Sequence, residues 1–279
     1  MNQIKTVGLL AFMTALLFAI VYAIGANVGL ALIIAFGFNF FAFFFSDRIA
    51  LASTRAKPVT EAELPDVYAI MRRLTQASSM PMPAIYRIDS PQPNAFATGR
   101  SPRKAAVAVT TGIMDQLSYD ELEGVLAHEL AHVQNRDILI STIAAMLGAA
   151  IAIVARMAFW FGGGDNRGPL GAIGALLSLI IAPLAAMLIR FAISRTREFQ
   201  ADRTGAETTG RPLQLAGALE KISEGARLRP MNVNPATSQL FIENPLKGIR
   251  GGSVSKLFST HPPTEERIQR LTDMAMGVS

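Results

Sequence analysis

The sequence contains no cysteine, which excludes disulfide bonds and metal sites built from thiolates. It also carries little charge, because Asp, Glu, Lys and Arg make up 17% of its 279 residues. Histidine is scarce too, with 3 in the chain. Any metal must therefore be held by histidine and carboxylate side chains. The low charge, together with 51% hydrophobic residues, favours a membrane protein over a soluble one.

The formal net charge is +5, which by itself would suit a partner that carries negative charge. We find no strand that interleaves aromatic and basic residues and no Arg-rich helix, so nucleic acid is not the expected partner. Several basic residues instead flank apolar runs. Anionic lipid headgroups, and hence the lipid bilayer, fit this placement better.

The apolar residues gather in runs long enough to cross a membrane. Residues 7–24 and 28–45 form two runs of 18 residues each, and a helix of that length is about 27 Å long, at the short end of a membrane span. Two further runs cover residues 138–161 and 170–191. The sequence therefore predicts four transmembrane helices in two hairpins, at 1–45 and 138–191. A cleaved signal peptide is the alternative for the first run, although a second run follows at once.

Basic residues indicate how these hairpins are oriented. Lys5, Arg48, Arg55 and Lys57 lie at the outer ends of the first hairpin, and none lies in its turn. The positive-inside rule then places both termini in the cytoplasm. Because each hairpin returns the chain to the face it left, residues 46–137 and 192–279 share one aqueous compartment and can form one cytoplasmic domain.

The part of this domain that precedes the second hairpin is expected to contain short strands and a helix. Proline and glycine separate three short segments that predict a small antiparallel sheet, at residues 84–89, 94–98 and 104–111. Ser118 and Glu121 then form a capping box that opens a helix ending near Asn135. Overall the sequence predicts a mainly α integral membrane protein.

That helix carries His128-Glu129-Leu130-Ala131-His132. Residues four apart lie on one helical face, so the imidazoles of His128 and His132 can share one ion. Glu129 lies about 100° further round the helix, where its carboxylate can reach a water on that ion. The motif therefore predicts a zinc site with two histidine ligands and Glu129 as a general base.

A third ligand is expected after the second hairpin, where residues 195–202 read Arg-Thr-Arg-Glu-Phe-Gln-Ala-Asp. Glu198 and Asp202 lie one helical turn apart and face the same way. We expect Glu198 to bind zinc and Asp202 to accept a hydrogen bond from the far nitrogen of a ligating histidine. Alone, this spacing is typical of a solvated helix, and only its pairing with the histidine motif makes it a candidate.

Three motifs together resemble the HtpX proteases: the His-Glu-Leu-Ala-His helix, the Arg-Glu-Phe-Gln-Ala-Asp segment, and Ser-Thr-His-Pro-Pro-Thr at residues 259–264. HtpX proteases are bacterial inner-membrane zinc metalloproteases of the gluzincin class, related to the CAAX prenyl proteases. The resemblance covers nearly the whole chain. It implies one Zn²⁺ per chain, an active site that faces the cytoplasm, and endoproteolysis of damaged or misassembled membrane proteins in quality control.

The gluzincin resemblance also implies roles for two other stretches. Asn94-Ala95-Phe96 is similar to the exposed edge strand that binds substrate backbone in thermolysin-like gluzincins, and an ordinary hairpin strand is the alternative. His261 is expected to donate a hydrogen bond to the oxyanion, as gluzincin histidines do. A direct contact with zinc and a surface turn histidine both stay open for it. Residues 226–255 have little periodicity and predict a loop over the site or a disordered insertion.

The predicted function is that of a zinc metalloendopeptidase that acts on protein substrates. Glu129 would take a proton from the zinc-activated water and pass it to the leaving amine. Two alternatives stay open. A membrane scaffold with a structural zinc would need four protein ligands, and a protease that processes prenylated proteins is not excluded by these residues.

Overall fold

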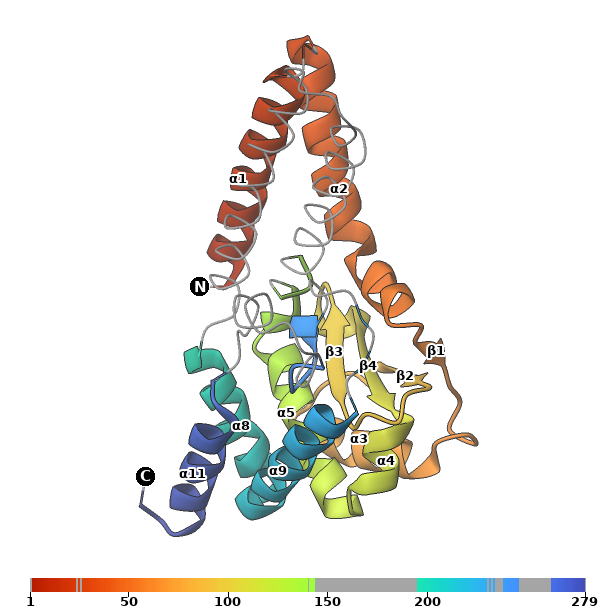
Figure 1. Cartoon of the computed structure of the whole chain (residues 1–279), viewed down its shortest axis with the longest axis vertical. Coiled ribbons are helices and arrows are strands. Elements are labelled where there is room, and N and C mark those ends of the chain that lie inside the picture. The colour runs from red at the N-terminus through yellow and green to blue at the C-terminus, as the bar shows by residue number, and fades with distance from the viewer. Residues whose placement is uncertain are drawn as a thin grey trace.

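The structure is a computed structural model that describes residues 2–23, 25, 27–139, 141–143, 195–229, 231, 233, 238–245 and 262–278. Helices α1 (Asn2–Ala23) and α2 (Val28–Ser53) form a hairpin that projects away from the other elements (Figure 1). In the turn, Asn27 caps α2 by accepting a hydrogen bond from the Leu30 N–H at 2.9 Å. The side-chain amide of Asn39 joins the two helices, because it donates to the carbonyl of Leu10 at 3.1 Å and to Oγ1 of Thr14 at 2.6 Å.

Helix α2 continues past the end of its apolar run at residue 45, because Asp47 and Arg48 add charge without breaking a helix. Among the described residues, no single helix has both the length and the hydropathy of a membrane span. Helix α2 bends by 59° between Val28–Phe41 and Phe43–Ser53, and the two parts together have the length and hydropathy of a broken span or a re-entrant loop. The apolar runs at 138–161 and 170–191 lie almost wholly outside the described residues, so the second hairpin stays a prediction.

The sheet has four strands in the order β1-β2-β4-β3. They are β1 (Lys57–Pro58), β2 (Ala84–Ile88), β3 (Ala95–Gly99) and β4 (Ala105–Thr110). The predicted strand segments agree with β2, β3 and β4, but the predicted antiparallel sheet is wrong, because β2 and β4 are parallel and the sheet is mixed. Strand β4 is buried along its whole length, as suits a central strand. It therefore lies between β2 and β3, and β3 forms an edge.

The two faces of the sheet contact different parts of the chain, because side chains alternate along each strand. One face packs on α3 (Pro65–Ala77) and α5 (Tyr119–Gln134). The other face includes Phe96, Ala106 and Ala108 and packs on the end of α2 and on Phe241. The edge strand β3 therefore lies between the α5 layer and the segment that contains Phe241.

The remaining helices assemble around α5. They are α4 (Thr111–Gln116), α8 (Arg195–Thr209), α9 (Pro212–Leu228) and α11 (Thr264–Ala275). Helix α5 lies between the sheet and the pair α8 and α9, and α11 packs on that pair (Figure 1). The predicted capping box is confirmed at the start of α5, where Ser118 and Glu121 bond to each other's backbone N–H. The helix ends at Gln134, as its sequence predicted.

Candidate active site

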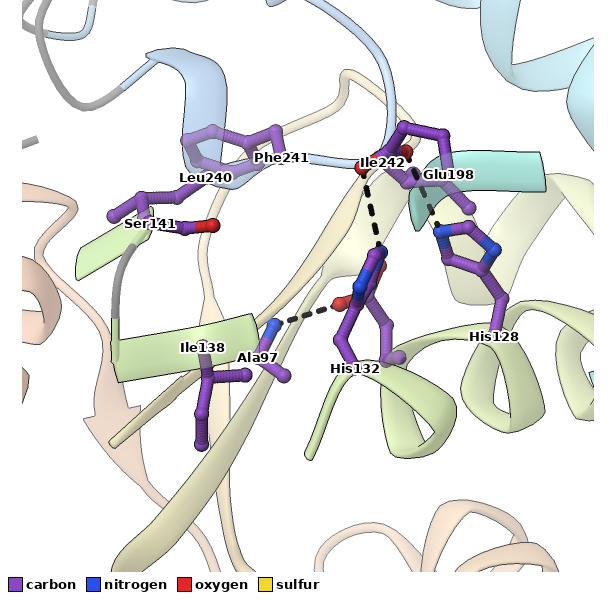
Figure 2. Close-up of a pocket in the computed structure, with 10 residues that line it drawn as sticks. Ala97, His128, His132, Ile138, Ser141, Glu198, Leu240, Phe241 and Ile242 are labelled. Atoms are coloured by element: carbon purple, nitrogen blue, oxygen red, sulfur yellow. Dashed lines mark hydrogen bonds and ion pairs between the residues drawn. The ribbon is translucent and has the colours of Figure 1, made fainter. Parts of the chain in front are cut away.

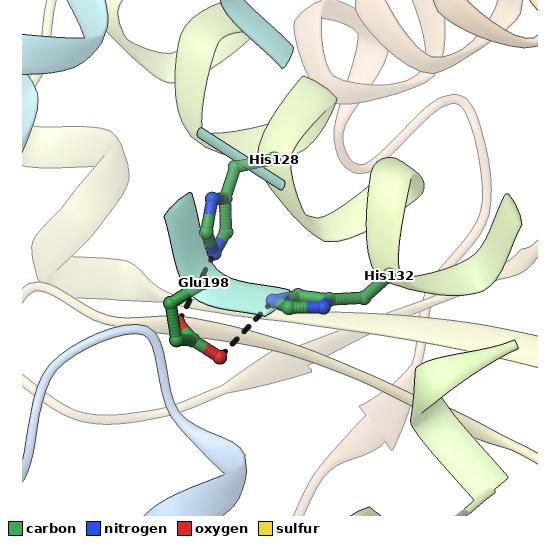
Figure 3. Close-up of side chains that lie close together, drawn as sticks. All are labelled: His128, His132 and Glu198. Atoms are coloured by element: carbon green, nitrogen blue, oxygen red, sulfur yellow. Dashed lines mark ion pairs between the residues drawn. The ribbon is translucent and has the colours of Figure 1, made fainter. Parts of the chain in front are cut away.

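Helices α5 and α8 bring His128, His132 and Glu198 together (Figure 3). Nε2 of His132 lies 3.5 Å from Oε1 of Glu198, and Nε2 of His128 lies 3.9 Å from Oε2. One ligand atom from each residue falls within 4.8 Å of the others. Ligands about 2 Å from a tetrahedral zinc ion are roughly 3.3 Å apart. The two imidazoles and the carboxylate therefore fit Zn²⁺ in both chemistry and spacing.

The close approach of α8 to α5 depends on Gly205. A Cβ atom at this position would lie 2.9 Å from the backbone nitrogen of His128 and 3.1 Å from its Cα. Only a residue without a side chain lets the two helices meet here. The glycine lies two turns of α8 beyond Glu198, so it sets how near that carboxylate comes to the histidines.

Asp202 contacts His128 as the spacing on α8 predicted. Its Oδ1 lies 2.9 Å from Nδ1 of the ring, which leaves Nε2 to face Glu198. Arg267 of α11 holds Asp202 from the other side, with Nε donating to Oδ2 at 2.8 Å and Nη2 donating to Oδ1 at 2.6 Å. All three side chains belong to residues that are at most 3% exposed. The carboxylate is thus fixed between a guanidinium and the ring that it orients.

The pKa values of these buried groups follow from the same contacts. Burial lowers the pKa of His128 to about 4, against the opposing effect of Asp202, so the ring is neutral and can bind metal. Burial acts to raise the pKa of Asp202, but Arg267 and His128 outweigh it and hold that pKa well below its usual range. Asp202 therefore stays ionised and keeps accepting from the ring.

His132 has a carboxylate partner of its own. Its Nδ1 lies 3.4 Å from Oδ2 of Asp137, and Nη1 of Arg197 lies 3.5 Å from Oδ1 of the same carboxylate. Burial acts to lower the pKa of His132, but Glu198 and Asp137 outweigh it and raise the pKa to about 9. The carboxylates around this ring therefore favour a positive charge on it, which is a proton in the absence of metal and would be replaced by a bound cation.

Glu129 lies on the wall of a cavity of about 30 Å³ beside His128, His132 and Glu198. Its Oε2 accepts a hydrogen bond from the N–H of Ala97 in strand β3 at 2.8 Å. Leu240, Phe241 and Ile242 close the cavity on another side. A water molecule needs roughly 10–15 Å³ of such space. The cavity therefore has room for about two waters next to the Glu129 carboxylate and the three side chains that could bind a metal ion.

The predicted substrate-binding residues lie beside this cavity but differ from the prediction in one respect. Asn94 immediately precedes the edge strand β3, and Ala95 and Phe96 begin it. An exposed edge was expected here, but all three residues are 0% exposed. Residues 240–243 cover them. The expectation of an exposed edge is therefore wrong for this structure, because the chain itself covers the position.

The structure adds residues that the sequence analysis missed, and it leaves one prediction open. The carboxylate of Asp137 contacts His132, and Arg267 holds the carboxylate of Asp202 against His128. A signal for Arg267 exists in the sequence, since it lies four residues before Leu271 on the buried face of an amphipathic helix. Asp137 comes after the end of α5, and no periodic pattern in the sequence marks it. His261 lies outside the described residues, so its role stays a prediction.

Comparisons with known proteins agree with this arrangement. The model of peptidase family M48 matches residues 61–275, which include α5, α8 and α11. A protease HtpX homolog from Thermococcus sibiricus (strain DSM 12597 / MM 739) is 49% identical over 288 residues, covering 99% of this chain and 98% of the relative.

Among solved structures, the crystal structure of S. mikatae Ste24p matches with a TM-score of 0.52 and 20% identity over 97% of this chain. This chain spans 65% of the length of Ste24p, so the likeness supports a shared fold. The extent of the family match and the near full-length relative show that the chain is a metallopeptidase that belongs to peptidase family M48.

Proposed function

We propose that this metallopeptidase is a zinc endopeptidase of the cell (plasma) membrane that cleaves damaged or misfolded membrane proteins. One observation carries the proposal: His128, His132 and Glu198 converge from two helices, and Glu129 lies on the wall of the same cavity. This places a candidate base next to candidate ligands, as water-mediated peptide hydrolysis requires.

The roles of the residues follow from their contacts. His128, His132 and Glu198 would hold the ion, with Asp202 orienting the first ring. When bound, Zn²⁺ lowers the pKa of a water molecule and polarises a peptide carbonyl. Glu129 accepts the proton of the attacking water and delivers it to the leaving amine.

Two other functions are less well supported. A structural zinc would be enclosed by four protein ligands, whereas the cluster found among the described residues has three and borders a cavity. Processing of prenylated proteins would draw on the likeness to Ste24p, which at 20% identity supports the fold alone. General endoproteolysis needs neither extra assumption.

The membrane location is supported by the surface of the N-terminal hairpin. Large apolar side chains on α2 are exposed, among them Ile33 at 71%, Phe36 at 61% and Phe40 at 61%. An apolar surface of this extent suits lipid tails rather than water. With a second hairpin at 138–191, four spans would keep both termini and the zinc site in the cytoplasm.

The activity is tested with detergent-purified protein and an unfolded substrate such as casein. Cleavage should stop with a chelator and return with added Zn²⁺. The Glu129→Gln variant should bind one zinc per chain, measured by elemental analysis, and cleave nothing. If its zinc content falls along with its activity, Glu129 is a ligand and the assignment of a base is wrong.

The third ligand is tested in the same way. Glu198→Ala should lose zinc, while Glu207→Ala, an exposed glutamate on the same helix, should keep it. Full zinc occupancy in Glu198→Ala would make His261 the next candidate ligand. Reporter fusions after Asp137 and at Ser279 test the topology, and a signal from outside the cytoplasm at either position would contradict it.

A further inference from the structure

Residues 240–244 run beside the edge strand β3. The N–H of Ile242 donates to the carbonyl of Ala95 at 3.0 Å, and the side-chain amide of Asn94 donates to the carbonyl of Glu243 at 2.9 Å. The N–H of Glu243 returns a longer bond to Oδ1 of Asn94 at 3.4 Å. Since the later residue pairs with the earlier one, the segment is antiparallel to β3.

The next pair along the segment continues this register. The ring of Phe241 meets the ring of Phe96 edge-on, with centroids 5.0 Å apart. Each of the three residues predicted to bind substrate is therefore engaged by residues 240–244. Further along β3, the N–H of Ala97 is bonded to Glu129. The edge that would bind a peptide is thus occupied from Asn94 to Ala97.

The same segment limits access to His128, His132 and Glu198. Leu240, Phe241 and Ile242 line the cavity beside the histidines (Figure 2). A volume of about 30 Å³ holds roughly two waters, so the described residues leave too little space for an extended peptide beside His128, His132 and Glu198 while the segment is in place. A peptidase with this site must move the segment before a substrate can be cut.

Polar contacts from α11 help to hold the segment on β3. Arg267 donates Nη1 to the carbonyl of Ile242 at 3.2 Å, and Thr264 donates its hydroxyl to Oε2 of Glu243 at 2.6 Å. Both donors belong to the first turn of α11. The helix that supports Asp202 therefore also holds the segment in place.

We propose that residues 240–244 are a built-in pseudosubstrate segment. An extended, unfolded peptide binds antiparallel to β3 by taking the place of this segment, because added strands are held through main-chain hydrogen bonds that accept many sequences. The inference rests on the proposed function and adds its regulation. The enzyme is closed at rest, and it opens when a peptide competes successfully for the edge.

The test compares two substitutions at one residue. Ile242→Pro removes the N–H that bonds to Ala95. Ile242→Ala keeps that N–H and removes more of the side chain than proline does, so it controls for lost packing. Both are made in the Glu129→Gln background, so that binding of a fluorescent unstructured peptide is measured without cleavage. Losing one hydrogen bond changes an equilibrium by roughly 2- to 10-fold. We expect the proline variant to bind the peptide tighter than the alanine variant by about that factor.

A second substitution guards against a folding defect in the proline variant. Thr264→Val is nearly isosteric and removes the hydroxyl that holds Glu243, so it should also tighten peptide binding relative to the Glu129→Gln parent. Zinc content and melting temperature identify variants that have not folded. If folded variants bind the peptide no more tightly than their controls, the segment is a fixed wall and the proposal is wrong.

A competition assay in trans completes the test. A synthetic Leu-Phe-Ile-Glu-Asn peptide should compete with the fluorescent peptide for Ile242→Pro, and a scrambled peptide of the same composition should compete less. Equal competition by both peptides would contradict a specific pseudosubstrate. A failure of the wild-type protein to cleave casein would instead contradict the proposed function, and it leaves the outcome of these binding comparisons unchanged.

Discussion

Replacing Arg267 by methionine tests how much the buried ion pair between Arg267 and Asp202 contributes to the stability of the fold. Arg267 is 1% exposed and forms two hydrogen bonds to Asp202, at 2.8 and 2.6 Å. Methionine fills similar space but leaves the Asp202 carboxylate buried without its counter-charge. Removing one partner of a buried ion pair costs about 3–5 kcal/mol. That is a large part of the roughly 5–15 kcal/mol that stabilises a typical domain.

The direction of the change in stability follows from the pKa of Asp202. Arg267 and His128 together outweigh burial and hold this pKa below its unfolded value, so the pair adds stability above about pH 4, the unfolded pKa of aspartate. That stability is lost as the pH falls through the folded pKa. Without Arg267, burial opposes ionisation, and the stability at neutral pH should fall.

The assay is thermal unfolding of the zinc-loaded protein in detergent at pH 7. Each kcal/mol shifts the melting temperature by about 2–4 °C for chains of 150–250 residues, so Arg267→Met should lower it by roughly 6–20 °C. Arg203→Met removes a guanidinium that is 68% exposed and paired with Glu207, and it should cost about 0–1 kcal/mol. Arg267→Lys should melt between wild type and Arg267→Met, because lysine keeps the charge but cannot donate the two parallel hydrogen bonds to Asp202.

A double substitution separates the charge from the packing. Arg267→Met combined with Asp202→Asn removes both charges, and it should melt higher than Arg267→Met alone because no unpaired buried carboxylate is left. A melting temperature for Arg267→Met within 2 °C of wild type, with zinc retained, would refute this reasoning. The buried pair would then contribute nothing measurable to the fold.

Three further predictions concern the proposed metal site and its surroundings. Asp137→Asn should weaken zinc binding by about 10- to 100-fold in a chelator competition, and unchanged affinity would show that its histidine partner needs no carboxylate. Gly205→Ala should lower the free energy of unfolding by about 1–3 kcal/mol and weaken zinc binding, because its Cβ clashes with the backbone of His128. Gly217→Ala should have neither effect, because its new Cβ would meet only a glutamate side chain. His261→Ala should keep its zinc and lower kcat by about 10² to 10³, and a wild-type rate would remove it from the catalytic residues.

The parts of the site that could be predicted from the sequence are those set by local helical geometry. His128 and His132 lie four residues apart on one helix, as do Glu198 and Asp202 on another, so each pair shares a face whatever the tertiary fold. The capping box at Ser118 is equally local. The prediction that these two helices meet relied on a topology argument, and the structure brings them together at the histidines.

Residues that reach the site through tertiary packing could not be predicted in this way. Arg267 lies 65 residues from Asp202 in the sequence, and no spacing rule links the two. The mixed sheet has the same explanation. Strand order depends on long-range pairing, here β2 with β4 in parallel, while a pattern of short strands separated by turns favoured simple hairpins.

The segment at 240–244 shows a more general limit. Its apolar triplet Leu240-Phe241-Ile242 is too short to show a period of 2 or 3.6 residues, and it lies in a stretch whose composition predicted a loop. Its pairing partner, Asn94, lies 149 residues earlier. A segment of this length has no independent stability, so its conformation depends on the edge of β3 that it covers. Because the segment depends on that edge, an extended peptide that pairs with the edge more strongly can replace it.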